Sequence, residues 1–422
     1  MEHLLGKSYF ETGDYDLAIE YLKKYESQTE KLNQEDFYQI GFVYYKNGNY
    51  KEALKHFKEL STQDNVLGQN ALFLIGDCYL KQGEKNFARN AFGECAKLNY
   101  DKSTQKEAEW NFAKLSYELK YDDVAIQAFQ KIDTSSKYHD EAQTLLSKLF
   151  LNTRDFTEAL SILESLPRKS EEMATTYQKV TYARAVELQN NGKEKEALEL
   201  YKKSMSSGSD HKTKALINYR LGDLAYKAKD FNQSSKYLND FLVAAKGITD
   251  LPDDATIYMA NYTLGFNALK AKNYSAALKH FEATSSQIKT NSAYISNDYI
   301  KTQIYMDALQ KAGDCAFKLN NYPKALENYN AVLTNAKGEK SYALFQKGMV
   351  LGLTNRTDEK IRSMIQLIDD NPGSAYIDDA YYQLGVSYQE LGKLASAKKP
   401  LELLVDEHPN SELYKAAYFV LD

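Results

Sequence analysis

The chain has 422 residues, of which 43% are hydrophobic and 26% are charged, and its formal net charge is −5. This composition is ordinary for a soluble protein, and an acidic chain without a cluster of arginine and lysine is a poor candidate for binding nucleic acid. No apolar run approaches the ~20 residues that a transmembrane helix needs, so we expect no direct membrane insertion.

One pattern occurs three times within the first hundred residues. Each copy has a glycine, a tyrosine three residues later, then an alanine, and a leucine or phenylalanine four residues after that alanine. The three copies are Gly6, Tyr9, Ala18 and Leu22; Gly41, Tyr44, Ala53 and Phe57; and Gly76, Tyr79, Ala88 and Phe92. Successive glycines are 35 residues apart, and a period of this size is typical of stacked structural repeats.

Weaker copies of the pattern continue to the end of the chain, which gives eleven repeats in all. The residue at the glycine position stays small throughout. In repeats four to eleven it is Ala113, Ser147, Ala185, Gly222, Gly265, Gly313, Gly348 and Gly385. Because glycine costs a helix about 1 kcal/mol relative to alanine, we infer that close packing requires the missing side chain.

Each repeat contains two helical patterns of apolar residues, separated by a short turn such as "NGNY" or "TGDY". Two helices joined by so short a turn pack antiparallel. We expect Gly41 to face Ala53 where the helices cross, with Tyr44 and Phe57 filling the space on either side. Ala53→Leu is then expected to overpack the crossing, at a cost of about 1–3 kcal/mol.

The order of Gly, Tyr, Ala and Phe at these spacings resembles the tetratricopeptide repeat. The resemblance covers essentially the whole chain and is strongest in the first three repeats and the last. It implies an all-α fold, a right-handed α-solenoid of about eleven helix pairs, without a sheet. It also implies a concave groove that binds partner proteins.

Two intervals between successive glycines are longer than the others. Gly222 to Gly265 spans 43 residues, and Gly265 to Gly313 spans 48. Insertions in repeat proteins map to loops on one face, often the binding face. A lengthened helix pair without a role is the alternative.

The second surplus falls in segment 283–308, which we expect to protrude and to be cleaved first by proteases between Ser285 and Asn291. The predicted organisation therefore has three parts. They are repeats one to eight over residues 1–282, the inserted segment over 283–308, and repeats nine to eleven with a C-terminal helix over 309–422.

Two motifs near the end of the chain, "NPGSAYIDDA" and "HPNSELYKAA", share a Pro-x-Ser ahead of the next helix. They are similar to repeats of the outer-membrane assembly lipoprotein group and its periplasmic relatives. This similarity implies a bacterial protein that is periplasmic or outer-membrane-associated; a cytoplasmic location is the alternative. The alternative is that Ser374 and Ser411 are ordinary N-caps of the helices that follow them.

The repeat pattern begins within five residues of the first residue and stops where another glycine would fall. Solenoids need polar capping repeats at their ends. We therefore expect the chain to be a piece of a longer protein, unless residues 411–422 form a natural capping helix.

The sequence contains no pattern that points to catalysis, a cofactor or a metal. It has no HExxH, no phosphate-binding loop, no GxSxG and no cluster of cysteine with histidine. His56 and His280 share one repeat position and are expected at the surface. The three cysteines, of which Cys78 and Cys315 also share a position, are expected to be buried apolar residues. We therefore predict that the protein is not an enzyme.

Aromatic residues recur on the first helix of each repeat, three residues before and four residues after the small residue. These two positions are seven residues apart, so they lie on one helix face. The predicted partner-binding groove contains Tyr38, Tyr45, Phe73, Trp110, Tyr117, Tyr182, Tyr219, Tyr226 and Tyr262. Packing between repeats is the alternative role for these side chains.

The predicted function is a non-catalytic scaffold that binds partner protein segments in this groove, in a bacterial cell-envelope assembly. The alternative is a glycan-binding module or an accessory to nutrient uptake at the cell surface. Such modules carry long irregular loops and more tryptophan, whereas this chain has a single tryptophan.

Overall fold

The computed structural model describes residues 1–153, 155–165, 170–335 and 340–421. These residues form 23 α-helices and one π-helical turn, with no strand among them. The all-α fold of about eleven helix pairs that the sequence predicts is therefore confirmed.

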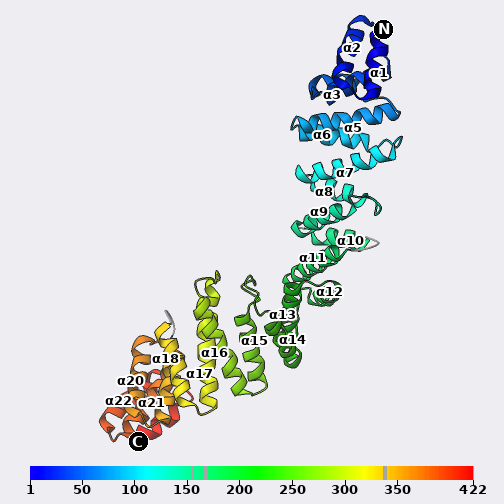
Figure 1. Ribbon diagram of the computed structural model, residues 1–422. Helices are drawn as coiled ribbons and strands as arrows, with labels where there is room; N and C mark the ends of the chain where they lie inside the picture. The colour runs from blue at the N-terminus through cyan, green and yellow to red at the C-terminus, as the bar shows by residue number, and fades with distance from the viewer. Residues whose placement is uncertain (154, 166–169, 336–339, 422) are drawn as a thin grey trace. The chain divides into compact units, whose positions relative to one another are not determined.

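The chain divides into two compact units, Met1–Arg184 and Ala185–Asp422, and in each the helices follow one another as pairs in chain order (Figure 1). The first unit contains α1 (Glu2–Thr12), α2 (Tyr15–Gln28), α3 (Gln34–Lys46), α4 (Tyr50–Leu60), α5 (Val66–Lys81), α6 (Lys85–Cys95), α7 (Lys102–Glu118), α8 (Asp122–Gln130), α9 (His139–Asn152) and α10 (Phe156–Ser165). The division falls within α11 (Glu171–Asn190).

The second unit continues with α12 to α23, and η1 lies between α16 and α17. Their bounds are α12 (Glu194–Ser207), α13 (His211–Lys227), α14 (Phe231–Ala244), α15 (Ile257–Lys270), α16 (Tyr274–Asn291), η1 (Ile300–Ile304), α17 (Tyr305–Lys318), α18 (Tyr322–Asn335), α19 (Ser341–Leu353), α20 (Thr357–Asp370), α21 (Ile377–Glu390), α22 (Leu394–Glu407) and α23 (Tyr414–Leu421).

Each regular repeat is a hairpin of two packed helices. α1 packs on α2, α3 on α4 and α5 on α6, and in the second unit α13 packs on α14 and α15 on α16. The second helix of a repeat also packs on the first helix of the next, as α4 does on α5. The apolar core is therefore a continuous row along each unit, as expected when repeats contact mainly their neighbours.

The small residue on the first helix makes room for a large side chain on the second helix, and this ring lies nearer than the predicted contact with Ala53 required. A Cβ atom built on Gly41 would lie 2.8 Å from Cε1 of Phe57, sixteen residues later. The same relation holds for Gly76 with Phe92, at 2.8 Å. The ring edge occupies the volume that a methyl group would need, and Ala53 on the second helix is fully buried.

Most of the described turns inside repeats have one residue in the left-handed region. Gly48 has φ 73°, and nothing lies within 4 Å of the Cβ that a larger residue would carry there. Five other glycines and five non-glycine residues adopt the same sign of φ in the described residues. The non-glycine residues are Lys120, Lys229, Lys272, Asn320 and Asn355, with φ between 55° and 64°. At these residues the backbone is strained, because a side chain disfavours a conformation that glycine adopts freely.

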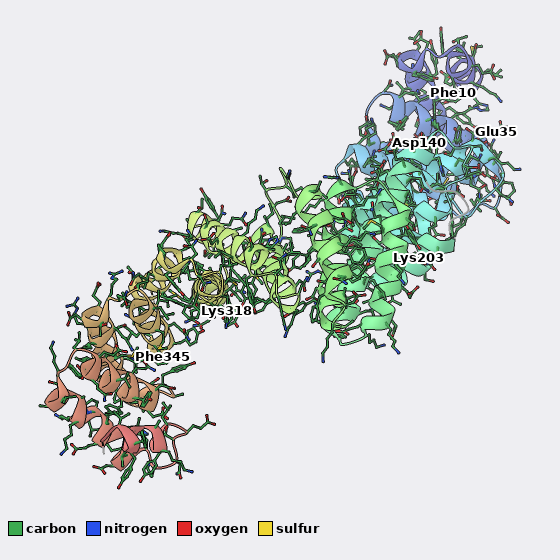
Figure 2. The ribbon with its side chains drawn as sticks, turned by 90° about the horizontal axis from the view of Figure 1, so that it is seen from below. Phe10, Glu35, Asp140, Lys203, Lys318 and Phe345 are labelled. Atoms are coloured by element: carbon green, nitrogen blue, oxygen red, sulfur yellow. The ribbon has the colours of Figure 1, made fainter. Side chains whose placement is uncertain are left out.

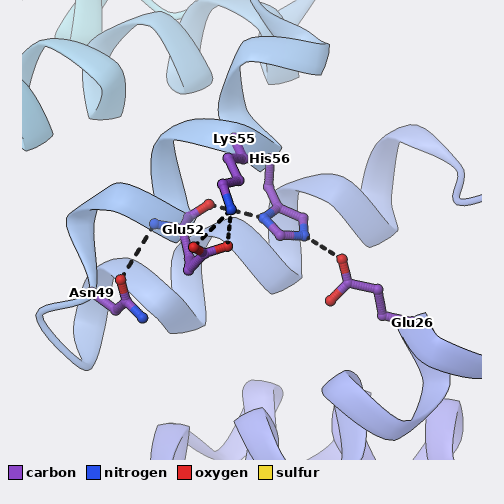
Figure 3. A network of polar contacts seen from close by, with 5 residues as sticks. All are labelled: Glu26, Asn49, Glu52, Lys55 and His56. Atoms are coloured by element: carbon purple, nitrogen blue, oxygen red, sulfur yellow. Dashed lines mark hydrogen bonds and ion pairs between the residues drawn. The ribbon is translucent and has the colours of Figure 1, made fainter.

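His56 is an interior residue, and this corrects the surface position predicted for it. Its side chain is on α4, and the residue is 6% exposed. Its Nδ1 lies 3.0 Å from the carbonyl oxygen of Glu52, and its Nε2 lies 2.8 Å from Oε1 of Glu26 on the preceding repeat (Figure 3). His280 is half-buried, with Nδ1 2.8 Å from Oδ1 of Asn261. Both rings therefore make polar contacts inside or between repeats.

Segment 283–308 is partly packed rather than a free protrusion. Its first residues complete α16, and η1 runs directly into α17. Four isoleucines of the segment are buried: Ile288, Ile295, Ile300 and Ile304. They join a hydrophobic cluster with Tyr258 and Leu309. The length of the insertion suggested a protrusion, but its apolar residues have enough neighbours to be covered.

The Pro-x-Ser serines do not cap the helices that follow them. Ser374 Oγ accepts a hydrogen bond of 3.1 Å from the backbone N–H of Tyr376, the residue just before α21, and so closes a turn ahead of that helix. Ser411 Oγ accepts the equivalent bond from the backbone N–H of Leu413, at 3.1 Å. Ser411 also donates to Oδ2 of Asp378 on the preceding repeat, at 2.5 Å. The motif therefore shapes the connection between repeats, and the expected N-caps are corrected.

Candidate partner-binding face

The first helices of successive repeats contact one another in the first unit. α1 contacts α3, α3 contacts α5, and α5 contacts α7. Within residues 1–130, successive second helices do not pack this closely. A stack that keeps one row of helices together and spreads the other curves toward the first row. The first-helix face is therefore the inner side of these repeats.

Seven of the nine predicted groove residues are partly exposed in the structure. They are Tyr38, Tyr45, Phe73, Tyr117, Tyr182, Tyr226 and Tyr262. Trp110 and Tyr219 differ, because they are only 4% and 6% exposed. Those two side chains lie in the core, so they are not available to a partner in this conformation.

The aromatic residues three before the small residue pack on the second helix of their own repeat. Ring centroids are 6.1 Å apart for Tyr38 and Phe57, and 5.3 Å apart for Phe73 and Phe92. Trp110 also stacks on Tyr138 at 4.7 Å, with an angle of 4° between the planes. These contacts give the rings a packing role, whether or not their exposed edges bind a partner.

In some repeats, a side chain near the end of the first helix, four residues after the small residue, makes a polar contact with the next repeat. Its partner there directly follows that repeat's own small residue. The Tyr45 hydroxyl donates to Oδ2 of Asp77 at 2.5 Å. Gln189 Nε2 donates to Oδ2 of Asp223 at 2.8 Å in the second unit. Burial is the main cause that raises the pKa of Tyr45, and the bond to Asp77 raises it further. Tyr45 is therefore both a surface aromatic and a polar link between repeats.

A second type of link also starts at the residue that directly follows the small residue. It joins this residue to the first turn of the first helix in the following repeat. Lys7 Nζ lies 3.5 Å from Oε2 of Glu35, a residue labelled in Figure 2, and Lys114 Nζ lies 3.0 Å from Oε1 of Glu141. In the second unit the Tyr342 hydroxyl donates to Oδ1 of Asp314 at 2.7 Å. Sequence reasoning missed these links, although complementary residues recur there 27 or 28 residues apart.

Six partly exposed rings form one continuous group in the first two repeats, which we name the aromatic cluster. Its members are Phe10, Tyr15, Tyr38, Phe42, Tyr45 and Tyr50. Neighbouring centroids are 5.7 to 6.1 Å apart. Phe42 contacts four of the other rings, and the Nζ of Lys46 lies 5.1 Å from its centroid. The central role of Phe42 was not predicted.

The described residues contain no group of three or more His, Cys, Asp or Glu side chains arranged to hold a metal ion. Cys78, Cys95 and Cys315 are free and buried, and burial raises the pKa of each thiol to about 12. Among the helices described, we find none with both the length and the apolar character needed to cross a membrane.

Family models match several parts of the chain. Two tetratricopeptide repeat models match residues 38–100 and residues 307–337 and 379–411. A model described as anaphase-promoting complex, cyclosome, subunit 3 matches residues 2–60. No curated protein matches the sequence at a significant level.

Two solved structures are also similar to this chain. The crystal structure of YrrB, a TPR protein with an unusual peptide-binding site, has a TM-score of 0.39 and 20% identity, covering 53% of this chain and 99% of that one. The structure of Naa15/Naa10 bound to HypK-THB has a TM-score of 0.42 and 12% identity, covering 99% of this chain and 65% of that one. Both similarities are low in sequence and in TM-score.

Proposed function

We propose that this protein is a non-catalytic scaffold whose first-helix face binds segments of partner proteins. Proteins with tetratricopeptide repeats generally mediate interactions between proteins, which supports the general class. The aromatic cluster is the single observation that carries the proposal to particular residues.

The aromatic cluster has the properties of a binding surface. Its rings supply a large apolar area, and aromatic side chains lose little entropy when a partner covers them. Lys46 adds a positive charge beside Phe42 and Tyr15, with its Nζ 5.1 Å and 5.7 Å from the two ring centroids. A partner segment with apolar side chains and an acidic residue is complementary to this surface.

Phe42→Ala tests the proposal most directly, because Phe42 joins the other rings. An extract of the source organism is passed over immobilised protein, and a recovered partner is purified and titrated by calorimetry. Phe42→Ala should weaken its affinity by about tenfold or more, as central aromatic anchors do. The melting temperature of the variant shows whether the repeat still folds.

Phe87→Ala is the matched control. Phe87 is an aromatic residue on the second helix α6 and is 56% exposed, outside the aromatic cluster. Its replacement should leave partner affinity unchanged. Equal binding by wild type and Phe42→Ala would overturn the assignment. A glycan array with binding that Phe42→Ala removes would instead favour the glycan-binding alternative.

The proposed setting is an envelope assembly of a bacterium, in the periplasm or at the outer membrane. The resemblance of the last two repeats to outer-membrane assembly lipoproteins supports it. Separating the cells of the source organism into periplasmic, membrane and cytoplasmic fractions, with detection by antibody, tests the setting. Recovery in the cytoplasmic fraction alone would contradict it.

A further inference from the structure

The two long connections predicted from the uneven repeat spacing meet in the second unit. One runs from α14 to α15, and the other runs from α16 to η1. Asp253 on the first connection accepts hydrogen bonds at Oδ2 from the backbone N–H groups of Ser296 and Asn297 on the second, each 3.2 Å long. The Ser296 hydroxyl donates to the same oxygen. Both insertions therefore build one local structure.

This structure borders an open cavity of about 580 Å³, within the usual range of ligand sites. Its apolar wall includes Ile248, Leu251, Ile257 and Ile295, and its polar groups include Asp253 and Gln287. Lysine, arginine and histidine do not occur among its lining residues. The wall therefore combines an apolar surface with hydrogen-bond acceptors and one negative charge.

Gln287 gives the cavity an unused acceptor. Its Oε1 atom is shielded from solvent and accepts no hydrogen bond from the described residues. A shielded acceptor without a donor destabilises a folded protein. A turn of the Gln287 amide would bring this atom to the cavity, where an N–H group of a ligand would satisfy it with a gain in free energy.

We propose that this cavity binds a segment of a partner protein in which a lysine or arginine is adjacent to a large apolar residue. The apolar side chain would contact the isoleucines, and a backbone N–H would donate to Gln287. The basic side chain would lie near Asp253, whose carboxylate faces N–H and O–H donors but no cation in the described residues. Tyr294 lies at the opening, 87% exposed, and offers a ring to the rest of the segment.

The cavity is lined by the two connections and by the helix ends next to them, with Ile257 and Tyr258 from α15 and Gln287 and Asn291 from α16. Extended chains place N–H donors and alternating side chains along such a cleft. The site is distinct from the aromatic cluster, and its occupant is independent of the function proposed for that surface. Phe42→Ala should therefore leave it unaffected.

A selection from a random phage-displayed library of dodecapeptides tests the proposal. The library is first depleted on a Thr249→Trp variant, in which an indole from an exposed lining position fills the cavity, and is then selected on wild type. Enriched peptides should pair Lys or Arg with Leu, Ile or Phe. They should bind the Thr249→Trp variant about tenfold or more weakly, and added salt should weaken binding to wild type.

Gln287→Met separates binding from structure. Removing the unused acceptor should raise the melting temperature, while the affinity of the selected peptides falls by about tenfold. Gln303→Met is the matched control, because Gln303 is an exposed glutamine on η1 outside the cavity. That control should change neither quantity. A purely structural role for Gln287 would lower the melting temperature and leave peptide affinity unchanged.

Three results would overturn the proposal. The first is no enrichment of peptides on wild type. The second is equal affinity of the enriched peptides for wild type and the folded Thr249→Trp variant. The third is a glycan, rather than any peptide, that binds wild type and is excluded by Thr249→Trp.

Discussion

Repeats two and four have the same large residue, phenylalanine, on the second helix but a different small residue on the first helix. In repeat two, a Cβ on Gly41 would lie 2.8 Å from the ring of Phe57, so the ring fills the space of the missing side chain. In repeat four, Ala113 holds the first position and is fully buried, and Phe129 is still only 1% exposed. The helix pair of repeat four therefore accommodates a methyl group that repeat two excludes. The position requires a small residue, and only some repeats require glycine.

The largest expected effect comes from exchanging these residues. Gly41→Ala should destabilise the protein by about 1–3 kcal/mol, because the ring of Phe57 is fixed between repeats and must move. Ala113→Gly should cost about 1 kcal/mol, from the flexibility of glycine in a helix. Denaturant unfolding of both variants measures the two values, with circular dichroism to confirm the helical content.

The two substitutions make the comparison easy to contradict. If Gly41→Ala stabilises the protein, helix propensity outweighs the contact and the tight fit is wrong. Repeat proteins often depart from two-state unfolding. Hydrogen exchange should therefore accompany the denaturant experiment, and we expect residues 105–153 to exchange faster than the regular repeats of 1–104.

The helix pairs could be predicted from the sequence because every repeat keeps a small residue, a large residue and a turn at fixed separations. The nearest neighbour of Gly41 could not be predicted, because the repeat spacing alone does not say whether Ala53 or Phe57 lies closer to it. Helix geometry and the size of the ring decide that. The burial of four isoleucines in segment 283–308 was not predicted for a similar reason: the length of the segment was counted, but its isoleucines were not.

The candidate site was only partly predictable. The first-helix aromatics were found by their spacing, yet Trp110 is covered by Tyr138, which lies in a connection that the repeat pattern leaves unassigned. Phe42 was missed because its position holds Lys7 and Asp77 in the flanking repeats. Its importance comes from contacts with rings on its own helix and on two other helices, α1 and α2, which are brought together only by the fold.

The second prediction concerns the link between Tyr45 and Asp77. Tyr45→Phe should lower stability by about 1 kcal/mol at neutral pH, because it removes a hydrogen bond to a carboxylate. The pKa of Tyr45 is raised in the folded protein from an ordinary value of 10.0. Its contribution is therefore fully present below pH 10 and is lost as the pH rises above that value.

Measurements of stability from pH 8 to pH 11 test this sign. Wild type should lose stability above pH 10 more steeply than Tyr45→Phe, because the variant has no phenol to ionise at this position. Tyr226→Phe serves as a control from the same repeat position, since its hydroxyl makes no hydrogen bond to a carboxylate of the residues that the structure describes. Equal slopes for wild type and Tyr45→Phe would contradict the proposed link.

A smaller effect is expected in the turn of repeat four. Lys120 has φ 64°, where repeat two has Gly48 at φ 73°. Lys120→Gly should stabilise the protein by about 0.5–1 kcal/mol, because it relieves a left-handed backbone at a residue with a side chain. Gly48→Lys should destabilise by a similar amount. Thermal unfolding of both variants gives the measurement, and shifts of the same sign would show that backbone strain is not the cause.

The smallest effect is expected from the ion pair between Lys114 and Glu141. Its atoms are 3.0 Å apart, but the two side chains are 41% and 51% exposed, so water and salt weaken the attraction. A double-mutant cycle with Lys114→Met and Glu141→Gln should give a coupling energy below about 0.5 kcal/mol. The cycle is needed because Lys114 also lies over the ring of Trp110, with Nζ 5.3 Å from its centroid, so the single substitution removes two contacts. A coupling energy above about 1 kcal/mol that persists in high salt would show that this link holds repeats four and five together as firmly as an apolar contact.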